Sequence, residues 1–279
     1  MLPHAPERII AGRHHPLIQR IRAMVRSGDL LEDGEVLLET PHLIEDAIQS
    51  GVAINTLLVR SDAPPPVRAL LQRVPGAAKQ YSIEPKRFAE LTSTENNPGI
   101  VALAKAPAWK EKDMFLGRRP LLLVLAGIQD PGNLGTILRV AEAFGATGVM
   151  ATKGTVSPFN AKAIRAASGT LFRLPVLSSL SPRGIVSLLR RENVALLAST
   201  PRGGESLAEI DVSKPLALAL GSEGAGLPRE LEEAGRRVSI PIAPRVESLN
   251  VATAASVMLY EIARQRQSAS PTAGAKEIV

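Results

Sequence analysis

The sequence contains no cysteine, and this absence excludes several kinds of chemistry at once. A chain without thiols cannot form disulfides, hold an iron–sulfur cluster, bind zinc through thiolates or use a cysteine nucleophile. Its longest apolar runs, such as that over 121–128, are far too short to cross a bilayer. The first residues also lack the apolar stretch of a secretory signal. We therefore expect a cytoplasmic protein that does not enter membranes.

Aromatic residues are scarce, at 3% of the chain. A surface that grips single-stranded nucleic acid by stacking bases on rings therefore has few side chains to use. The net charge is +6 and uneven: residues 1–118 hold 15 Lys and Arg against 14 Asp and Glu, whereas residues 119–279 hold 18 against 13. Excess arginine favours a polyanionic partner that is recognised by its backbone and shape, although a mildly basic protein can also simply be soluble.

Helix and strand patterns alternate along the chain and predict two α/β domains. Residues 1–106 hold helical spacing over 16–28, 41–51, 64–74 and 85–92, with strand patterns over 35–40, 54–60 and 99–105. Charge, proline and the single tryptophan mark a linker over 107–119. Near-continuous apolar strands separated by helices over 120–268 predict a parallel sheet covered by helices on both faces. The composition of 269–279 predicts a disordered tail.

The elements of the second domain can be placed individually. Its strands are predicted over 121–128, 147–152, 171–176, 195–200, 215–220 and 237–242. Its helices are predicted over 133–144, 160–168, 182–192, 227–234 and 249–267.

Three strand-to-helix turns, within 128–139, 216–231 and 239–256, carry the candidate site. Such turns lie at the carboxyl ends of sheet strands, where open α/β folds place their ligands. The turn over 221–226 reads G-x-x-G-x-G instead of the dinucleotide order, and the next strand lacks the acid that holds a ribose. This disfavours a nucleotide-dependent oxidoreductase. Neither glycine-containing turn carries the lysine and hydroxyl of a phosphate-binding P-loop.

Taken singly, the polar residues of these turns also have simpler explanations. Asn133 and Ser248 fit helix N-caps, and Arg139 fits a solvated position on its helix. The glycines fit a structural turn, although Glu223 inside that turn and Asn250 in the first turn of the last helix are harder to explain in this way.

Taken together, the three segments resemble the SpoU (TrmH-like) family of RNA ribose 2′-O-methyltransferases, within the SPOUT superfamily. The matching pieces are N-L-G-T-I-L-R (133–139), G-S-E-G-A-G-L (221–227), and I-P-I (240–242) with E-S-L-N-V-A-T-A (247–254). Residues 157–176 are similar to the family's stretch between its first two motifs. The first domain resembles the ribosomal-protein-like RNA-binding domain of members that act on ribosomal RNA, with departures at His14, His15 and Thr40.

The resemblance implies S-adenosyl-L-methionine as methyl donor and a ribose 2′-hydroxyl of structured RNA as acceptor. It also implies a C-terminal trefoil knot and a homodimer formed through the knot region. The catalytic residues that it implies are Arg139, Asn133, Glu223, Ser248 and Asn250. The cofactor-binding residues that it implies are Thr200, Gly221, Ser222, Glu223, Gly224, Ile240, Ile242, Ser248, Leu249 and Asn250. Arg139 would act either as a base or only by stabilising negative charge on the acceptor oxygen.

The appended first domain favours large-subunit (23S) ribosomal RNA as the substrate. A tRNA 2′-O-methyltransferase and a non-enzymatic, RNA-binding ribosome assembly factor of the same fold remain alternatives. No metal is expected, because the sequence has no metal-ligand spacing, and His4 and His42 are expected to be surface residues.

Overall fold

The computed structural model describes residues 8–10, 12, 14–30, 33–74, 77–92 and 97–268. The chain forms two compact units, one of Met1–Ala108 with Ser157–Arg173 and one of Trp109–Val156 with Leu174–Val279. Ser157–Arg173, which the sequence analysis includes in the second domain, thus packs with the first unit. The predicted boundaries at 106, 119 and 268 stay predictions. His4 and the predicted tail lie outside the described residues.

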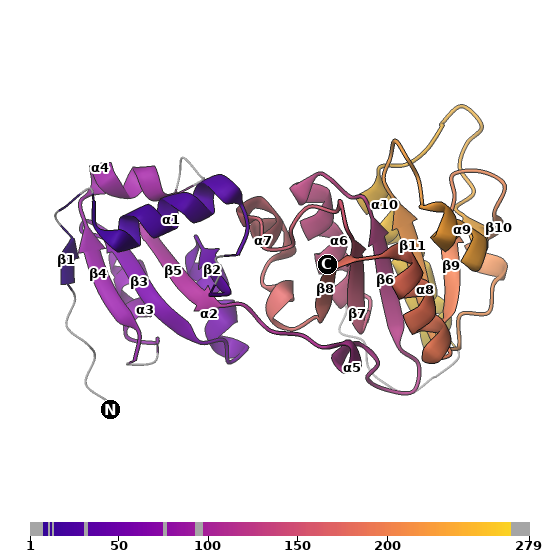
Figure 1. The fold of residues 1–279 in the computed structure, drawn as a ribbon, viewed down its shortest axis with the longest axis horizontal. Helices are drawn as coiled ribbons and strands as arrows, with labels where there is room; N and C mark the ends of the chain where they lie inside the picture. Colours follow the sequence, from indigo (N-terminus) through magenta and orange to yellow (C-terminus); the bar gives the residue numbers. More distant parts are fainter. Residues whose placement is uncertain are drawn as a thin grey trace. The chain divides into compact units, whose positions relative to one another are not determined.

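The first unit is built on a five-stranded mixed sheet of order β1-β4-β3-β5-β2 (Figure 1). Its strands are β1 (Arg8–Ile10), β2 (Glu35–Leu38), β3 (Ile54–Arg60), β4 (Lys79–Ile83) and β5 (Ile100–Lys105). Its helices are α1 (Pro16–Ser27), α2 (Pro41–Gln49), α3 (Pro65–Leu71), α4 (Pro85–Phe88) and the 3-10 turn η1 (Ala89–Leu91). Ile18, Ile21 and Met24 recur at helical spacing on α1, so one face of this helix packs into the core.

Two of the departures from the family pattern have local explanations in this unit. The Nδ1 atom of His15 accepts a hydrogen bond from the backbone N–H of Leu17, 3.2 Å away, at the start of α1. The Oγ1 atom of Thr40 accepts one from the backbone N–H of Leu43, 3.3 Å away, at the start of α2. Both side chains therefore satisfy donors that a helix N-terminus leaves free.

Ser157–Arg173 supplies α7 (Ala161–Ala167) and the 3-10 turn η2 (Thr170–Phe172) to the first unit. Arg165 forms an ion pair with Glu39, whose side chain is only 1% exposed. The Ser157 hydroxyl donates to Oδ1 of Asp29 over 2.6 Å. Gly169 has a φ of +73°, and a Cβ there would lie 2.3 Å from Oδ2 of Asp46. The close approach of the chain at this point thus requires glycine.

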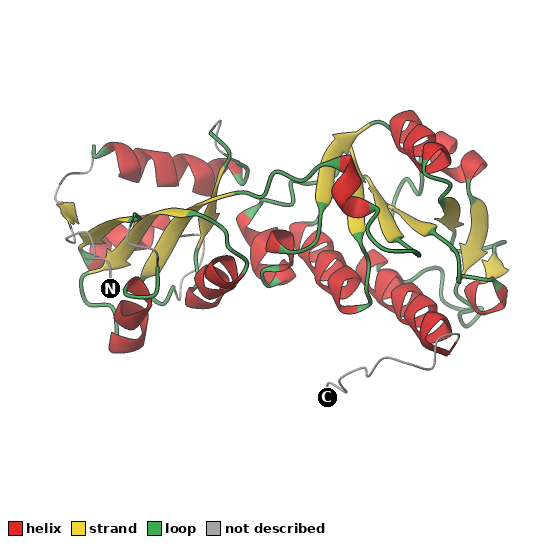
Figure 2. Cartoon of the chain, turned by 90° about the horizontal axis from the view of Figure 1, so that it is seen from below, coloured by secondary structure: helices red, strands yellow, loops and turns green. Residues whose placement is uncertain are grey.

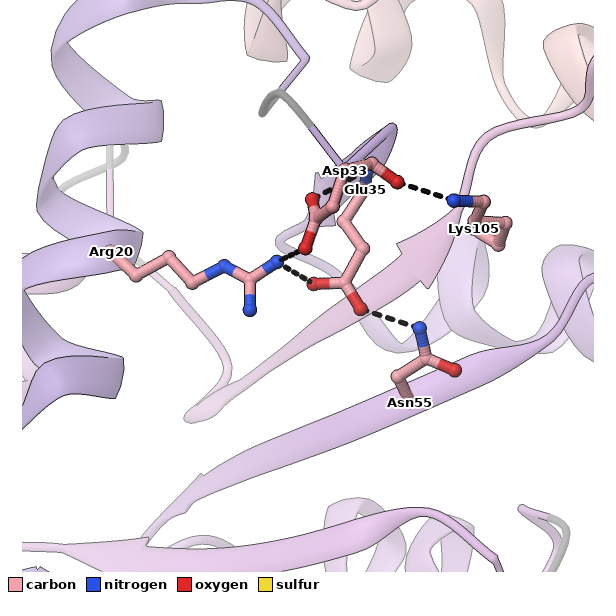
Figure 3. Close-up of polar contacts among 5 residues, drawn as sticks. All are labelled: Arg20, Asp33, Glu35, Asn55 and Lys105. Carbon is pink, nitrogen blue, oxygen red and sulfur yellow. Dashed lines mark hydrogen bonds and ion pairs between the residues drawn. The ribbon is translucent and has the colours of Figure 1, made fainter.

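A cluster of paired polar side chains surrounds the start of β2 (Figure 3). The guanidinium of Arg20 contacts the carboxylates of Asp33 and Glu35, at 2.7 Å from Oε2 of Glu35. Asn55 donates to the other carboxylate oxygen of Glu35, and Lys105 donates to the backbone carbonyl of Asp33. Because the side chain of Glu35 is 8% exposed, these partners offset the cost of burying its charge.

The second unit contains a seven-stranded sheet of order β10-β12-β9-β11-β6-β7-β8. Its strands are β6 (Leu121–Ala126), β7 (Gly148–Thr152), β8 (Val176–Leu180), β9 (Ala195–Ser199), β10 (Glu205–Ser206), β11 (Leu216–Gly221) and β12 (Arg236–Ser239). Every pairing in it is parallel. The helices are α5 (Glu111–Met114), α6 (Pro131–Ala143), α8 (Pro182–Arg191), α9 (Arg229–Ala234), α10 (Val251–Ser268) and the 3-10 turn η3 (Leu207–Glu209).

Helices cover both faces of this sheet (Figure 2), which confirms the predicted architecture. In β6, Leu122 and Val124 belong to the core cluster that contains Ile185 and Leu188 of α8. The alternate residues Leu123 and Leu125 are also fully buried, as expected for a strand packed on both sides. Within the part of the chain that the structure describes, no helix combines the length and hydrophobicity needed to span a membrane.

The predicted strand over 171–176 is wrong. Residues 170–172 form η2, and β8 begins only at Val176. The apolar run was misleading because Leu171 and Phe172 are buried in the first unit and do not extend the sheet. The short or polar strands β1, β4 and β10 were not predicted, nor was α5 inside the predicted linker.

Candidate active site

Three neighbouring strands, β9, β11 and β12, end at the same edge of the second unit's sheet. The loops that follow them enclose, with the start of α10, a cavity of about 360 Å³. The residues that line it are Ser199, Thr200, Pro201, Leu220, Gly221, Ser222, Glu223, Gly224, Ala225, Gly226, Ile240, Ile242, Ser248, Leu249, Val251, Ala254 and Met258. Nine of the ten residues that the resemblance implies for the cofactor lie in this lining, Asn250 being the tenth.

The turn after β11 contains three glycines, and the absence of a side chain has a different consequence at each of them. A Cβ on Gly221 would lie 2.2 Å from the carbonyl carbon of Gly226, so the turn closes on itself only without a side chain. Gly226 has a φ of +67°, the left-handed region that favours glycine. A Cβ on Gly224 would meet no atom within 4 Å. Since Gly224 lines the cavity, its missing side chain leaves room for a ligand.

A hydrogen-bond network joins one residue from each of the three predicted turns. The Nδ2 atom of Asn250 donates to Oε1 of Glu223 over 2.9 Å and to Oδ1 of Asn133 over 3.2 Å. The same Glu223 oxygen accepts the backbone N–H of Val251 over 3.3 Å. Carboxylates are favourable at helix N-termini, so Glu223 also stabilises the start of α10.

The helix caps differ from those predicted. Asp130 is the N-cap of α6 and accepts the backbone N–H of Asn133 over 2.8 Å, so Asn133 lies inside the helix. At α10, Oδ1 of Asn250 accepts the backbone N–H groups of Ala252 and Thr253, which leaves Ser248 outside the capping position. The prediction failed because Asp130, in D-P-G-N, and Asn250 are as suitable for capping as the residues chosen.

Arg139 is set apart from these residues. It lies on α6, is exposed and does not line the cavity. Among the residues that the structure describes, it has no hydrogen-bond or ion-pair partner. The geometry of one chain therefore brings together Asn133, Glu223 and Asn250, with Ser248 in the cavity wall, but not Arg139.

Sequence analysis missed part of the cavity wall. The residues absent from the prediction are Ser199, Pro201, Leu220, Ala225, Val251, Ala254 and Met258. Val251, Ala254 and Met258 recur at helical spacing on one side of α10, so a helical projection from Asn250 would have found them. No cluster of three or more His, Asp or Glu residues suited to a metal ion occurs in the described ranges.

The chain matches two protein-family models. Residues 120–260 match the SpoU rRNA Methylase family, and residues 7–118 match the model named thiostrepton-resistance methylase, N terminus. The chain belongs to the SpoU rRNA methylase family. It is therefore an S-adenosylmethionine-dependent RNA 2′-O-methyltransferase.

Individual relatives cover nearly the whole chain. An uncharacterized tRNA/rRNA methyltransferase of Synechocystis is 36% identical over 269 residues, which is 94% of this chain and 95% of the relative. The 23S rRNA (guanosine(2553)-2′-O)-methyltransferase of Bacillus subtilis is 33% identical over 81% of this chain and 87% of its own. The SpoU methyltransferase AviRb of Streptomyces viridochromogenes, solved with S-adenosylmethionine, has a TM-score of 0.82 at 28% identity and covers 91% of this chain and 99% of its own.

The cavity fits S-adenosylmethionine on its own geometry. Its volume of about 360 Å³ lies within the range of small-molecule sites. Ile240, Ile242 and Leu249 provide an apolar surface suited to an adenine, and Glu223 provides a carboxylate. Gly224 leaves open the space that any side chain there would take.

Proposed function

We propose that the enzyme methylates a ribose 2′-hydroxyl of large-subunit (23S) ribosomal RNA, at a guanosine. The proposal rests on the cavity formed by the loops after β9, β11 and β12, because it joins a donor site to polar groups from all three motifs. The choice of RNA is supported by the Bacillus relative and by the rRNA (guanosine-2′-O-)-methyltransferase of Ralstonia, which is 36% identical over 65% of this chain. The match of the first unit to the thiostrepton-resistance model adds support.

S-adenosylmethionine supplies an electrophilic methyl group, and the remaining tasks belong to this chain. The acceptor hydroxyl must be positioned, and the negative charge that grows on its oxygen must be stabilised. We assign the first task to the network of Glu223, Asn250 and Asn133. Asn250 is held from both ends, by the N-terminus of α10 and by Glu223, so the amide of Asn133 is fixed in turn. No described residue accepts a hydrogen bond from Nδ2 of Asn133, so that donor is available to RNA.

We assign the second task to Arg139. An arginine stays protonated near neutral pH, so it binds the developing alkoxide and an adjacent phosphate better than it removes a proton. Its exposure and its lack of a described acidic partner support this role. Ser248 would contribute its hydroxyl to the cavity wall.

We further propose a homodimer in which Arg139 of one subunit serves the cavity of the other. The proposal is supported by the absence of Arg139 from the cavity lining of its own chain. Two inactive variants test it by mixing. Gly224→Val would place a branched side chain on the wall of the donor cavity, where a Cβ meets no atom within 4 Å, and Arg139→Ala would remove the cation. If Arg139 acts across the dimer, co-refolded mixed dimers regain activity, whereas mixtures stay inactive if it acts within one chain.

We also propose that the C-terminal part of the second unit is threaded as a trefoil knot. The meeting of the loops after β9, β11 and β12 at one cavity supports it. Pulling the unfolded chain from both ends would give a contour length shortened by a tightened knot, and a full-length contour would contradict it. The cytoplasm is the proposed location, since ribosomal RNA is found there.

Mapping of 2′-O-methyl groups in total RNA from a deletion strain tests the substrate. We expect one guanosine mark to disappear from 23S rRNA and to return with the wild-type gene but not with Arg139→Ala. Loss of a tRNA mark with all ribosomal marks unchanged would contradict the proposal.

A further inference from the structure

A second cavity, of about 400 Å³, lies beside the donor cavity in the same unit. Its lining consists of Pro201, Arg202, Ser239, Ile240, Pro241, Ile242, Ala243, Pro244 and Val246. It shares Pro201, Ile240 and Ile242 with the donor cavity, so a molecule in one lies next to a molecule in the other. The proposed function leaves this second cavity unused.

Most of the wall of the second cavity is apolar and conformationally restricted. The three prolines have fixed φ angles, so the wall loses little backbone freedom when a ligand binds. Val246 is 43% exposed, unusually open for a large aliphatic side chain. The hydroxyl of Ser239 donates to the backbone carbonyl of Gly204 over 3.0 Å, so its hydrogen is already engaged.

Arg202 is the charged residue of this lining. Its backbone carbonyl accepts the Thr200 hydroxyl over 2.9 Å, which fixes the loop that carries it. Its exposed guanidinium has no acidic or hydrogen-bond partner among the residues described. Arg236 differs, because its hydrogen bonds to Glu205 engage it and lower the pKa of that carboxyl.

We propose that the second cavity binds the base of the acceptor nucleotide and that Arg202 reads its edge. The proposal rests on the proposed function. The acceptor ribose must reach the donor cavity, so the base attached to it must bind next to that cavity. A nucleobase has two apolar faces, which suit proline and aliphatic walls, and a polar edge. The paired donors of a guanidinium match the O6 and N7 acceptors of guanine, so guanine is the preferred base.

Steady-state methylation of a 23S rRNA transcript tests the role of Arg202. We expect Arg202→Ala to lower kcat/KM for RNA by about 5- to 150-fold, the range for one bidentate base contact. Its affinity for S-adenosylmethionine should stay within about twofold of wild type in calorimetry. Arg245→Ala is the matched control, because Arg245 is an exposed arginine of the loop after β12, which contributes to this cavity, but it lies outside the lining itself. Arg245→Ala removes the same charge and should lower kcat/KM for RNA clearly less than Arg202→Ala does.

A base analogue distinguishes reading of the base from attraction by charge. A transcript with 7-deazaguanine at the target position lacks the N7 acceptor. It should be methylated more slowly than guanine by wild type and by Arg245→Ala, but at the same rate as guanine by Arg202→Ala. Arg202→Lys, which keeps the charge without the paired donors, should not restore the preference. An equal penalty for the analogue in wild type and Arg202→Ala would overturn the proposal.

A second variant keeps the test independent of Arg202. Val246→Trp would occupy the cavity from its exposed rim and should raise the KM for RNA while the protein melts as wild type does. If Arg202→Ala or Val246→Trp weakens binding of S-adenosylmethionine as much as it weakens use of the RNA, the second cavity belongs to the donor site and the proposal fails. If either variant changes the mass of the protein in light scattering, this surface instead contacts a second copy of the chain, and the proposal is also overturned. Failure of the proposed function is a separate result, in which wild type itself methylates no ribosomal RNA.

Discussion

Three arginines of the first unit and three of the second differ in whether the chain itself supplies a partner. In the first unit, Arg20, Arg22 and Arg73 each form an ion pair with a carboxylate. In the second unit, Arg139, Arg202 and Arg245 are exposed, and no described residue neutralises them. A paired guanidinium has exchanged its hydration for a partner within the chain, whereas an unpaired one keeps its donors for a ligand. Other arginines of the second unit, such as Arg236 and Arg264, are also paired, so only particular arginines of this unit keep their donors for the RNA.

The largest effect is expected at Arg139. Arg139→Ala should lower kcat by at least about 100- to 1000-fold, because a donor to the developing oxyanion is lost. Its affinity for S-adenosylmethionine should be nearly unchanged, since Arg139 is assigned to the acceptor oxygen and its phosphate and not to the methyl donor. Single-turnover methylation and calorimetry measure the two quantities.

The control for Arg139 is Arg26→Ala, which removes an exposed arginine without a described partner from α1 in the first unit. This variant should keep its single-turnover rate once RNA is saturating. Equal losses of rate in Arg139→Ala and Arg26→Ala would contradict the comparison between the units. The effect of removing an exposed arginine without a described partner would then not depend on its place in the chain.

The glycines of the donor turn should give the next largest effect. Gly221→Ala places a methyl group 2.2 Å from a backbone atom, so the turn must move and the donor cavity with it. We expect at least a tenfold loss of S-adenosylmethionine affinity, about 1.4 kcal/mol or more, together with a lower melting temperature. Gly224→Ala meets nothing within 4 Å, so it should melt as wild type does and weaken binding only through lost space. Equal melting temperatures of the two variants would contradict this account.

The sequence was informative where burial or strand ends determine position. The apolar strands β6 and β11 were predicted because both of their faces are buried, and the site loops because parallel strands end together. Contacts between distant residues were not accessible. Asn250 reaches Asn133 across 117 positions, and no local pattern encodes that hydrogen bond. The segment around Leu171 was misread because its apolar residues pack with the first unit, which periodicity cannot reveal.

A buried and an exposed ion pair should differ in how much they stabilise the fold, and this difference is the third prediction. Glu39 is 1% exposed and paired with Arg165, so Glu39→Gln removes a buried carboxylate from its ion pair and should cost about 3 kcal/mol of stability. Glu205 and Arg236 are each 53% exposed, so water screens their attraction and Glu205→Gln should cost much less stability than Glu39→Gln. Urea unfolding measures both changes. A double variant that also carries Arg165→Gln should recover part of the loss, and its failure to do so would show that the Glu39 effect arises elsewhere.

The smallest expected effect is a pH dependence in α10. Glu261 accepts two hydrogen bonds from Arg264, each 2.8 Å long, and one from Gln265, and these hold its pKa at about 2, below the ordinary value of 4.5. A carboxyl whose pKa is lowered by folding stabilises the native state above its unfolded pKa. That contribution is lost as the pH falls from about 4.5 to about 2.

Glu261→Gln should therefore flatten the dependence of unfolding free energy on pH in this window, with less than about 1 kcal/mol at stake because Arg264 is half exposed. Arg264→Gln, which removes the first cause of the shift, should flatten the same window. If instead both variants keep the wild-type slope between pH 4.5 and 2, the exposed Arg264 is screened by water. Of the arginine–carboxylate pairs compared, only those with a buried carboxylate, such as Glu39 with Arg165, would then stabilise the fold.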